Sequence, residues 1–270
     1  MSLNLTHWNP RIPFTRAQRN ILQKWSQEQL TLKSQLKLID DTLKQKPRFI
    51  AGVDVSFFLN SDRAVASLVI VKVLRDGTIR TVYEGYDARV KMTEPYIPGF
   101  LAFRELKPLL GLFEKLKRTH PEYWPDVVIV DGNGYLHPRG FGLASHLGVK
   151  LDVPTIGVAK RLLFVPNMGI RRSDNSKVRR WMQSAKPLET LPLGRVDGKP
   201  VTAAMKVGNT SDAVFISQGH RVSLEMAVRV VRLVGCERDT CEVVRLADRK
   251  SRDLIKRVNW QKEWENACRN

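Results

Sequence analysis

Three carboxylates in this chain lie where an apolar run meets a turn or a helix. Asp54 interrupts the apolar run 49–57, Asp131 follows the apolar run 127–130 just before a glycine-rich turn, and Glu105 lies near the start of an amphipathic helical pattern. A charge within an apolar strand is costly unless another group pairs with it. Acids delivered from two strand ends and one helix suit an oxygen-rich site of the kind that holds Mg²⁺. The chain must therefore fold so that these three places meet.

The hydrophobic pattern predicts the order of the elements that carry these acids. Strands are expected at 49–57, 64–74 and 78–90, with a hairpin turn at Asp76 and Gly77. A helix at 99–118, a strand at 126–130, a short helix at 140–147 and a strand at 154–160 follow. Three antiparallel strands followed by crossover-connected strands indicate an α/β fold with a central mixed β-sheet flanked by α-helices. This is the order of ribonuclease H-like folds.

The remaining segments extend this core without a linker that would divide it. We expect an N-terminal helix at 15–43, opened by a capping box of Thr15 and Gln18. The segment 166–200, rich in Pro, Gly and basic residues, is predicted to be irregular with one helix at 174–184. Strands at 203–207 and 214–217 and helices at 223–233 and 251–267 complete the chain. We predict one domain over 1–270, with a core at 49–233 and a basic C-terminal helix and tail at 250–270.

The charge balance indicates a polyanionic partner. The 45 Lys and Arg residues exceed the 27 Asp and Glu residues, which gives a formal net charge of +18. A field of this sign attracts nucleic acid, although the same charge also serves solubility. We expect the phosphate contacts in two basic clusters, about half of whose members would otherwise form a solvated face: Lys177, Arg179 and Arg180, and Arg249, Lys250, Arg252, Lys256 and Arg257.

Other classes of protein are not favoured. No apolar run is long enough to cross a bilayer, so no membrane partner is expected. The three cysteines are too few for a disulfide framework, and Cys236 and Cys241 lack enough neighbours for a zinc site. We expect a monomer in the cytoplasm, with the nucleus or nucleolus as a further location.

Several motifs together resemble the endonuclease V family, whose members are metal-dependent nucleases that cut near deaminated purines. The resemblance runs from about 49 to 233 and rests on segments 52–56, 95–105, 131–134, 137–144, 154–160 and 217–220. It implies that Asp54, Glu105 and Asp131 hold Mg²⁺, which Mn²⁺ can replace, and that His220 is a fourth catalytic group. It also implies that Lys160, at the end of a strand, contacts the cleaved phosphate.

The resemblance further implies which residues recognise the base. The segment Tyr96, Ile97 and Pro98 resembles a wedge in which Tyr96 stacks against a base. His137 would contact substrate, support Asp131 from behind, or simply hold a turn. Backbone groups can distinguish hypoxanthine from adenine, and glycines permit their close approach. The family-matched residues for this pocket are Gly99, Leu101, Gly132, Gly134, Leu143 and Leu163.

The function implied is a metal-dependent endonuclease that hydrolyses a phosphodiester bond 3′ to inosine. The Cys236 and Cys241 segment and the basic C-terminal extension resemble animal members, which act on inosine-containing RNA, single-stranded or tRNA-like. A DNA-repair endonuclease for deoxyinosine, another ribonuclease H-like nuclease, and a catalytically idle inosine-RNA binding protein are the alternatives. Loss of any of the three acids would favour the idle protein, and all three are present.

Overall fold

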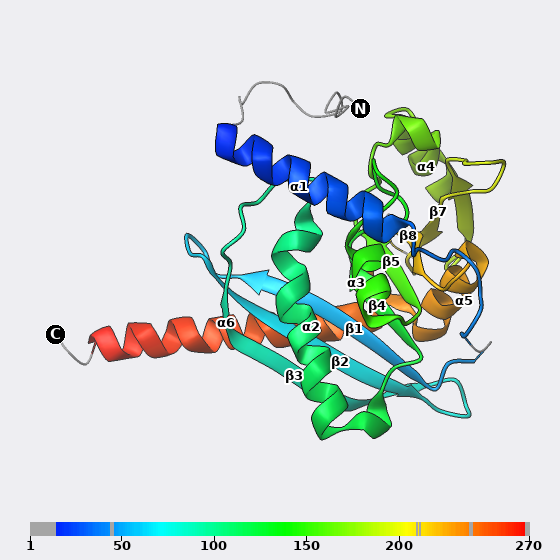
Figure 1. The fold of residues 1–270 in the computed structure, drawn as a ribbon. Helices are drawn as coiled ribbons and strands as arrows, with labels where there is room; N and C mark the ends of the chain where they lie inside the picture. Colours follow the sequence, from blue (N-terminus) through cyan, green and yellow to red (C-terminus); the bar gives the residue numbers. More distant parts are fainter. Residues whose placement is uncertain (1–14, 44–45, 209, 211, 238–239, 268–270) are drawn as a thin grey trace.

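The computed structural model of the protein is built around one eight-stranded mixed sheet (Figure 1). It describes residues 15–43, 46–208, 210, 212–237 and 240–267. The strand order is β3-β2-β1-β4-β5-β8-β7-β6. Strands β1, β4 and β5 are mutually parallel and the other neighbours are antiparallel. The strands are β1 (Phe49–Phe57), β2 (Arg63–Val73), β3 (Ile79–Lys91), β4 (Val127–Asp131), β5 (Thr155–Ala159), β6 (Thr190–Leu193), β7 (Thr202–Lys206) and β8 (Ala213–His220).

Helices cover both faces of the sheet, which confirms the predicted mixed sheet flanked by helices. On one face, α2 (Leu101–Thr119) and α3 (Leu143–Leu151) pack on alternate residues of β1 and β4 such as Val53 and Val130. On the other face, α5 (Leu224–Val234) and α6 (Glu242–Ala267) pack on the intervening residues, including Ile50 and Ile129. Both strands are apolar on both faces because the β1–β4 pair lies in the middle of the sheet.

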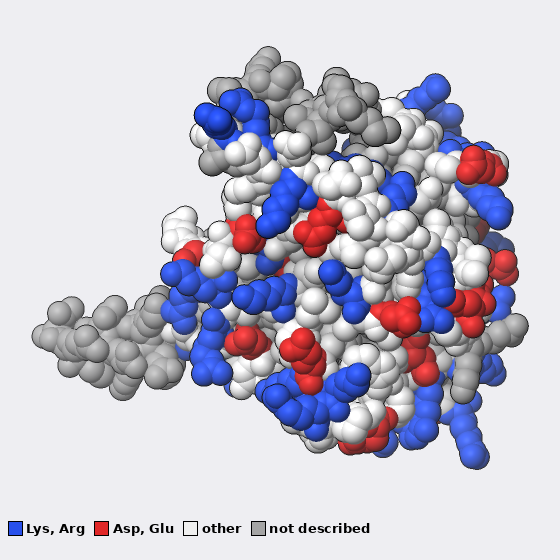
Figure 2. Space-filling view, viewed as in Figure 1, with Lys and Arg blue, Asp and Glu red and all other residues white. Residues whose placement is uncertain are grey.

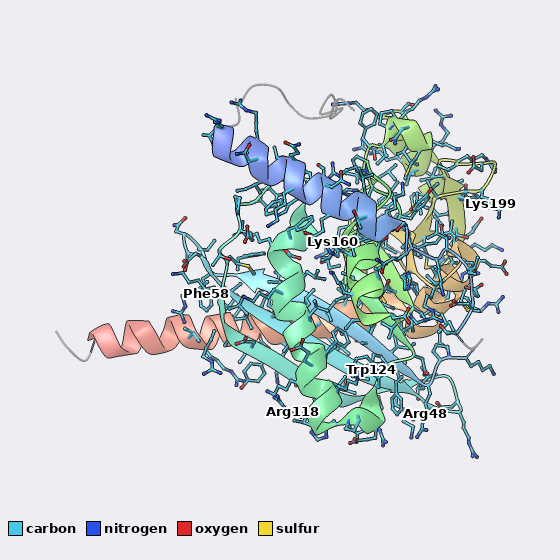
Figure 3. The ribbon with its side chains drawn as sticks, in the orientation of Figure 1. Arg48, Phe58, Arg118, Trp124, Lys160 and Lys199 are labelled. Carbon is cyan, nitrogen blue, oxygen red and sulfur yellow. The ribbon has the colours of Figure 1, made fainter. Side chains whose placement is uncertain are left out.

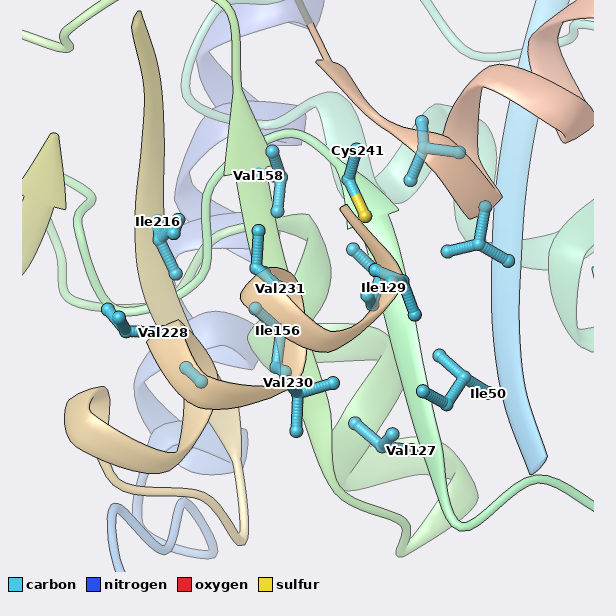
Figure 4. Close-up of a cluster of buried hydrophobic side chains, with 14 of the residues drawn as sticks. Ile50, Val127, Ile129, Ile156, Val158, Ile216, Val228, Val230, Val231 and Cys241 are labelled. Atoms are coloured by element: carbon cyan, nitrogen blue, oxygen red, sulfur yellow. The ribbon is translucent and has the colours of Figure 1, made fainter. Parts of the chain in front are cut away.

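The core on the α5 and α6 side consists mainly of β-branched side chains (Figure 4). Ile129, Ile156 and Ile216 come from three adjacent strands and are fully buried. Such side chains pack well on a pleated surface, which explains why these short strands form. Cys241 belongs to this core and faces Cys236 across the small hairpin of β9 (Cys236–Glu237) and β10 (Thr240–Cys241).

The N-terminal helix is shorter than predicted. Helix α1 (Arg16–Lys33) begins with the expected capping box but ends ten residues before residue 43. The following segment instead binds the edge of the molecule near α5, where Asp40 accepts hydrogen bonds from the backbone N–H and hydroxyl of Ser223. The backbone N–H of Arg221 also donates to the carbonyl of Lys37. These long-range hydrogen bonds outweigh the local helical pattern.

Two predictions for the second half of the chain are also corrected. Helix α6 begins at Glu242, nine residues before the predicted start at 251, and the predicted C-terminal tail at 268–270 lies outside the described part. The segment 166–200 contains α4 (Asp174–Met182), as expected, but also strand β6. Pro192 concealed that strand, and Pro is tolerated there because β6 is an edge strand. Across the described residues we find no helix with the length and apolar character of a membrane span.

Candidate active site

Asp54 and Asp131 are neighbours because of the register between two parallel strands. Val53 of β1 lies opposite Val130 of β4, so the next residue along each strand is an aspartate. Adjacent strands are about 4.8 Å apart, and residues at matching positions point to the same face. Val53 and Val130 face α2, so both carboxylates point toward α6. Parallel pairing therefore brings the two strand-end acids together, as the sequence predicted.

Polar groups of β1 and α6 surround the Asp54 carboxylate. The hydroxyls of Ser56 and Ser251 donate to Asp54 Oδ2 over 2.9 and 2.7 Å. Burial raises the pKa of Asp54 above its usual value, the two hydroxyls lower it, and the negative charge of Asp248 raises it again. The sequence had not placed Asp248 or Ser251 in the site. Both lie in the N-terminal part of α6, and the predicted start of that helix excluded Asp248.

Glu105 approaches the strand-end acids from the other side of the sheet. It lies on the buried face of α2, and with Asp54 and Asp131 it lines a cavity of about 270 Å³. Burial raises its pKa to about 8, and the charges of Asp54 and Asp131 add to the increase. Without a compensating cation, Glu105 is therefore largely protonated at neutral pH.

A second cavity, of about 440 Å³, opens on the α6 side of the same acids. It is lined by Asp54, Asp131 and Asp248 together with the cations Lys160, Arg252 and Lys256. Lys160, labelled in Figure 3, follows β5, and its Nζ lies 3.7 Å from Asp131 Oδ2. The structure therefore places this lysine beside the acids, and its predicted contact with the cleaved phosphate stays a prediction. A negatively charged phosphate entering this cavity would meet acids on one wall and cations on another.

The donor set suits a hard divalent cation in its chemistry. Asp54, Glu105 and Asp131 supply only oxygen. Burial and, after it, the charges of Asp54 and Asp131 raise the pKa of Glu105, and a bound cation would oppose both effects. Among the described residues, no three or more His, Cys, Asp or Glu side chains are arranged to hold one ion directly. Mg²⁺ ordinarily keeps several waters and binds one or two carboxylates, so a partly hydrated ion fits these residues.

The wedge segment is anchored at one carbonyl. Gly99 has φ +78°, and its oxygen accepts from the Nε2 atom of His137 over 3.0 Å and from Gln29 over 3.3 Å, with Arg139 as a third donor. His137 Nδ1 accepts from the Arg139 backbone N–H, and burial lowers the pKa of His137 to about 3. His137 is therefore a neutral residue that holds this loop. Ile97 is buried on Trp25 of α1, whereas Tyr96 is 64% exposed, as a base-stacking residue requires.

Three of the six expected pocket residues line a cavity at the acids, and the other three lie elsewhere. Leu101, Gly132 and Leu143 line the cavity that contains Glu105. Gly99 anchors the wedge segment instead. Gly134 lies outside this lining, and a Cβ there would be 2.0 Å from the carbonyl oxygen of Gln218 in β8, so glycine is required for packing. Leu163 packs on a separate cluster around Val165 and Met168.

His220 lies away from the acids, contrary to its predicted place among them. It ends β8 opposite Thr155, the first residue of β5, whereas Lys160 follows the last residue of that strand. The length of β5 separates these two ends by roughly 13 Å. The His220 ring is buried, with Nδ1 accepting from the Lys37 backbone N–H and Nε2 3.3 Å from Asp152. His220 holds the segment after α1 at the end of β5 that lies away from the acids.

Comparison with known proteins identifies the family of this chain. The family model for Endonuclease V matches residues 30–249, most of the chain. The chain belongs to the endonuclease V family. Human Endonuclease V is 40% identical over 244 residues, which cover 87% of this chain and 84% of the human protein. Mouse Endonuclease V is 39% identical over 246 residues, with 88% and 70% coverage.

Solved structures of the family share the fold, which is the ribonuclease H-like type expected from the sequence. The crystal structure of human Endonuclease V superposes with a TM-score of 0.78 at 38% identity, covering 88% of this chain and 99% of that one. A Ciona intestinalis Endonuclease V, solved with a 24mer DNA containing an inosine followed by a ribo-adenosine, gives 0.81 at 30% identity, with 88% and 99% coverage. The chain is thus a member of a family of inosine-directed endonucleases.

Proposed function

We propose that this protein is a Mg²⁺-dependent endoribonuclease that hydrolyses the phosphodiester bond 3′ to inosine in single-stranded or tRNA-like RNA. The observation that carries the proposal is the pairing of Asp54 and Asp131 at the ends of parallel strands, between a cavity that contains Glu105 and one that contains Lys160. That arrangement provides acids and a cation around one position for a phosphate.

Each residue has a definable task in this proposal. Asp54, Glu105 and Asp131 would hold Mg²⁺ or Mn²⁺, with Asp248 as an additional acid on the α6 side. The bound ion would supply a more acidic water and neutralise charge on the phosphate oxygens. Ser56 and Ser251 fix the orientation of the Asp54 carboxylate. Lys160 stabilises the negative charge that develops on the phosphate when water attacks phosphorus and the P–O bond breaks.

The inosine base is proposed to occupy the smaller cavity. Its walls are Leu101, Leu143 and the backbone of Gly132, which has φ +140° and no side chain to fill the space. Backbone donors and acceptors at such a wall match the N1 and O6 atoms of hypoxanthine and mismatch those of adenine. Exposed Tyr96, on a loop held by His137, would fill the gap that the extracted base leaves.

Two observations support RNA as the substrate. The chain shares 39–40% identity with the mouse and human relatives over most of its length, and the family resemblance implies that animal members act on inosine-containing RNA. The nucleotide after inosine in the Ciona complexes is a ribonucleotide. The same complexes otherwise contain DNA, which favours deoxyinosine-directed DNA repair as the second candidate. Cytoplasmic or nuclear location, a monomeric state and a single domain remain predictions.

Basic residues on α6 and α4 are proposed to follow the phosphate backbone. Figure 2 shows Lys and Arg side chains spread widely over the visible face among fewer acidic ones. Several cluster members already have intramolecular partners, since Lys250 binds Glu84 over 2.6 Å and Arg252 binds Asp248 over 2.6 Å. Affinity for RNA should decrease steeply with salt, as counterion release requires.

The test is cleavage of matched single-stranded RNA and DNA oligonucleotides that carry inosine or adenosine at one position, with Mg²⁺, Mn²⁺ or EDTA. Wild type and Asp54→Asn are run side by side. The proposal requires metal-dependent cutting of inosine RNA that the substitution abolishes. Equal or better cutting of inosine DNA would move the role to DNA repair. Binding without cutting in every reaction would show an idle binding protein.

A further inference from the structure

The two cavities at the acids differ in what they can bind. They share Asp54, Val55 and Asp131, but the smaller is otherwise lined chiefly by apolar side chains, whereas the larger adds several cations and one aromatic residue, Phe57. The inosine cavity accounts for one base only. A cleaved strand also continues past the reacting phosphate, and its next nucleotides need a place beside the acids.

Phe57 is at the edge of the larger cavity and is suited to stacking. It is the last residue of β1, three positions after Asp54, and is 39% exposed although it is a large apolar side chain. The guanidinium of Arg104 lies over its ring at 5.0 Å. The Nε atom of Arg104 is buried and, among the described residues, has no hydrogen-bond partner. The Phe57 ring therefore packs against this guanidinium.

Cations complete the surface that a nucleotide would need. Lys160, Arg252 and Lys256 line the same cavity, and Ile255 adds an apolar contact from α6. Proteins that bind single-stranded nucleic acid combine aromatic rings, on which bases stack, with cations that track the phosphates. The cavity volume of about 440 Å³ lies within the usual range of roughly 300–1,000 Å³ for pockets that hold small ligands.

We propose that Phe57, backed by Arg104, is the stacking platform for a base adjacent to the cleaved phosphodiester, at the end of β1 where the larger cavity adjoins the one proposed to hold inosine. The inference rests on the proposed nuclease function and adds a second nucleotide site to it. Stacking is tolerant of sequence because every base has a π face, so this site contributes affinity and alignment without selecting a particular base.

Phe164 provides a matched control. It is 42% exposed and lies under the guanidinium of Arg172 at 5.5 Å, so it has the same kind of ring and cation as Phe57. It lines neither cavity at the acids. Loss of an exposed aromatic ring in general would affect both positions equally, whereas loss of a nucleotide site would affect Phe57 alone.

The experiment combines protein variants with RNA that lacks single bases. Wild type, Phe57→Leu, Phe57→Tyr and Phe164→Leu are assayed on inosine RNA in which each nucleotide flanking the cut is in turn replaced by an abasic ribose. We expect one abasic position to reduce kcat/KM of wild type, Phe57→Tyr and Phe164→Leu by about 5- to 150-fold. On RNA that carries every base, Phe57→Leu should already have this reduced kcat/KM, and the same abasic position should reduce it no further.

Two measurements, cleavage of the RNA and binding of the RNA in EDTA, separate this inference from the proposed function. If wild type cuts inosine RNA but Phe57→Leu shows the same abasic penalties as wild type, the stacking site is wrong and the nuclease function stands. If no protein cuts, the proposed function fails, and the abasic series measured as binding affinity still tests the platform. A 2-aminopurine base at the sensitive position of wild-type complexes should lose fluorescence on stacking, and unchanged fluorescence at every flanking position would overturn the proposal even if Phe57→Leu misfolds.

Discussion

Replacing Glu105 with glutamine should stabilise the metal-free protein while abolishing cleavage. Burial and the charges of Asp54 and Asp131 raise the pKa of Glu105 from 4.5 to about 8. Between these pH values the folded protein binds the proton that the unfolded chain has released, so its stability decreases as pH increases. Glutamine has nearly the same shape and no charge, so the variant does not share this decrease.

The magnitude follows from the two pKa values. A pH of 7 is about 2.5 units above the pKa of 4.5 that the Glu105 carboxyl has in the unfolded chain, so the carboxyl is ionised there. In the folded protein the same carboxyl is still mainly protonated at pH 7. The wild-type carboxyl then costs about 3 kcal/mol, compared with less than about 1 kcal/mol at pH 5. Glu105→Gln should therefore exceed wild type in free energy of unfolding by about 3 kcal/mol at pH 7, and by less than about 1 kcal/mol at pH 5.

Urea unfolding at several pH values in EDTA measures this difference. Glu114→Gln is the matched control, because Glu114 is on the same helix but exposed. Saturating Mg²⁺ should stabilise wild type more than Glu105→Gln, since a ligand that binds only the folded state stabilises it by mass action. A Glu105→Gln variant equal in stability to wild type at pH 7, or a gain that does not depend on pH, would refute the electrostatic reasoning.

Three further substitutions test the supports of the site. Gln29→Leu should lower the free energy of unfolding by roughly 2–4 kcal/mol in urea, because buried groups around the wedge loop lose their partners, whereas exposed Gln27→Leu should change it little. Gly134→Ala should destabilise by at least about 1–3 kcal/mol by the same assay, because its Cβ meets the backbone of β8, whereas Gly111→Ala, with open space around it, should be neutral or stabilising. Ser251→Ala should reduce kcat by roughly tenfold with KM little changed, because it removes one of the hydroxyls that donate a hydrogen bond to the Asp54 carboxylate. Equal stability within either matched pair, or unchanged kcat for Ser251→Ala, would contradict the corresponding contact.

The central strands and their acids were predictable because local pattern and tertiary structure agree there. A continuous apolar run indicates a strand that is buried on both faces, and the run that ends at Asp131 is such a strand. Asp54 was recognisable because a charge in such a run needs a partner. Their adjacency depends only on parallel pairing, which the strand-helix-strand order already implied.

The failures come from contacts between distant segments. His220 occurs in a family motif, but antiparallel pairing of β8 carries it to the far end of β5. Asp248 was missed because the start of α6 depends on the close contact of β1 with its first turn, where a Cβ at Gly52 would lie 2.3 Å from the carbonyl oxygen of Val243. Gly134 was assigned to a base pocket because a glycine in a turn looks the same whether it approaches a ligand or another strand.

The position of α6 has a consequence for how the protein is made. The hydrogen bond from Ser251 to Asp54 spans 197 positions of the chain. A ribosome releases the strand acids long before it releases the helix that supplies Ser251 and Asp248. A nascent chain, or a fragment that ends before α6, therefore carries Asp54 and Ser56 without the second hydroxyl, that of Ser251, that orients the carboxylate. The cell is exposed to this proposed nuclease only once α6 has been synthesised and has folded against β1.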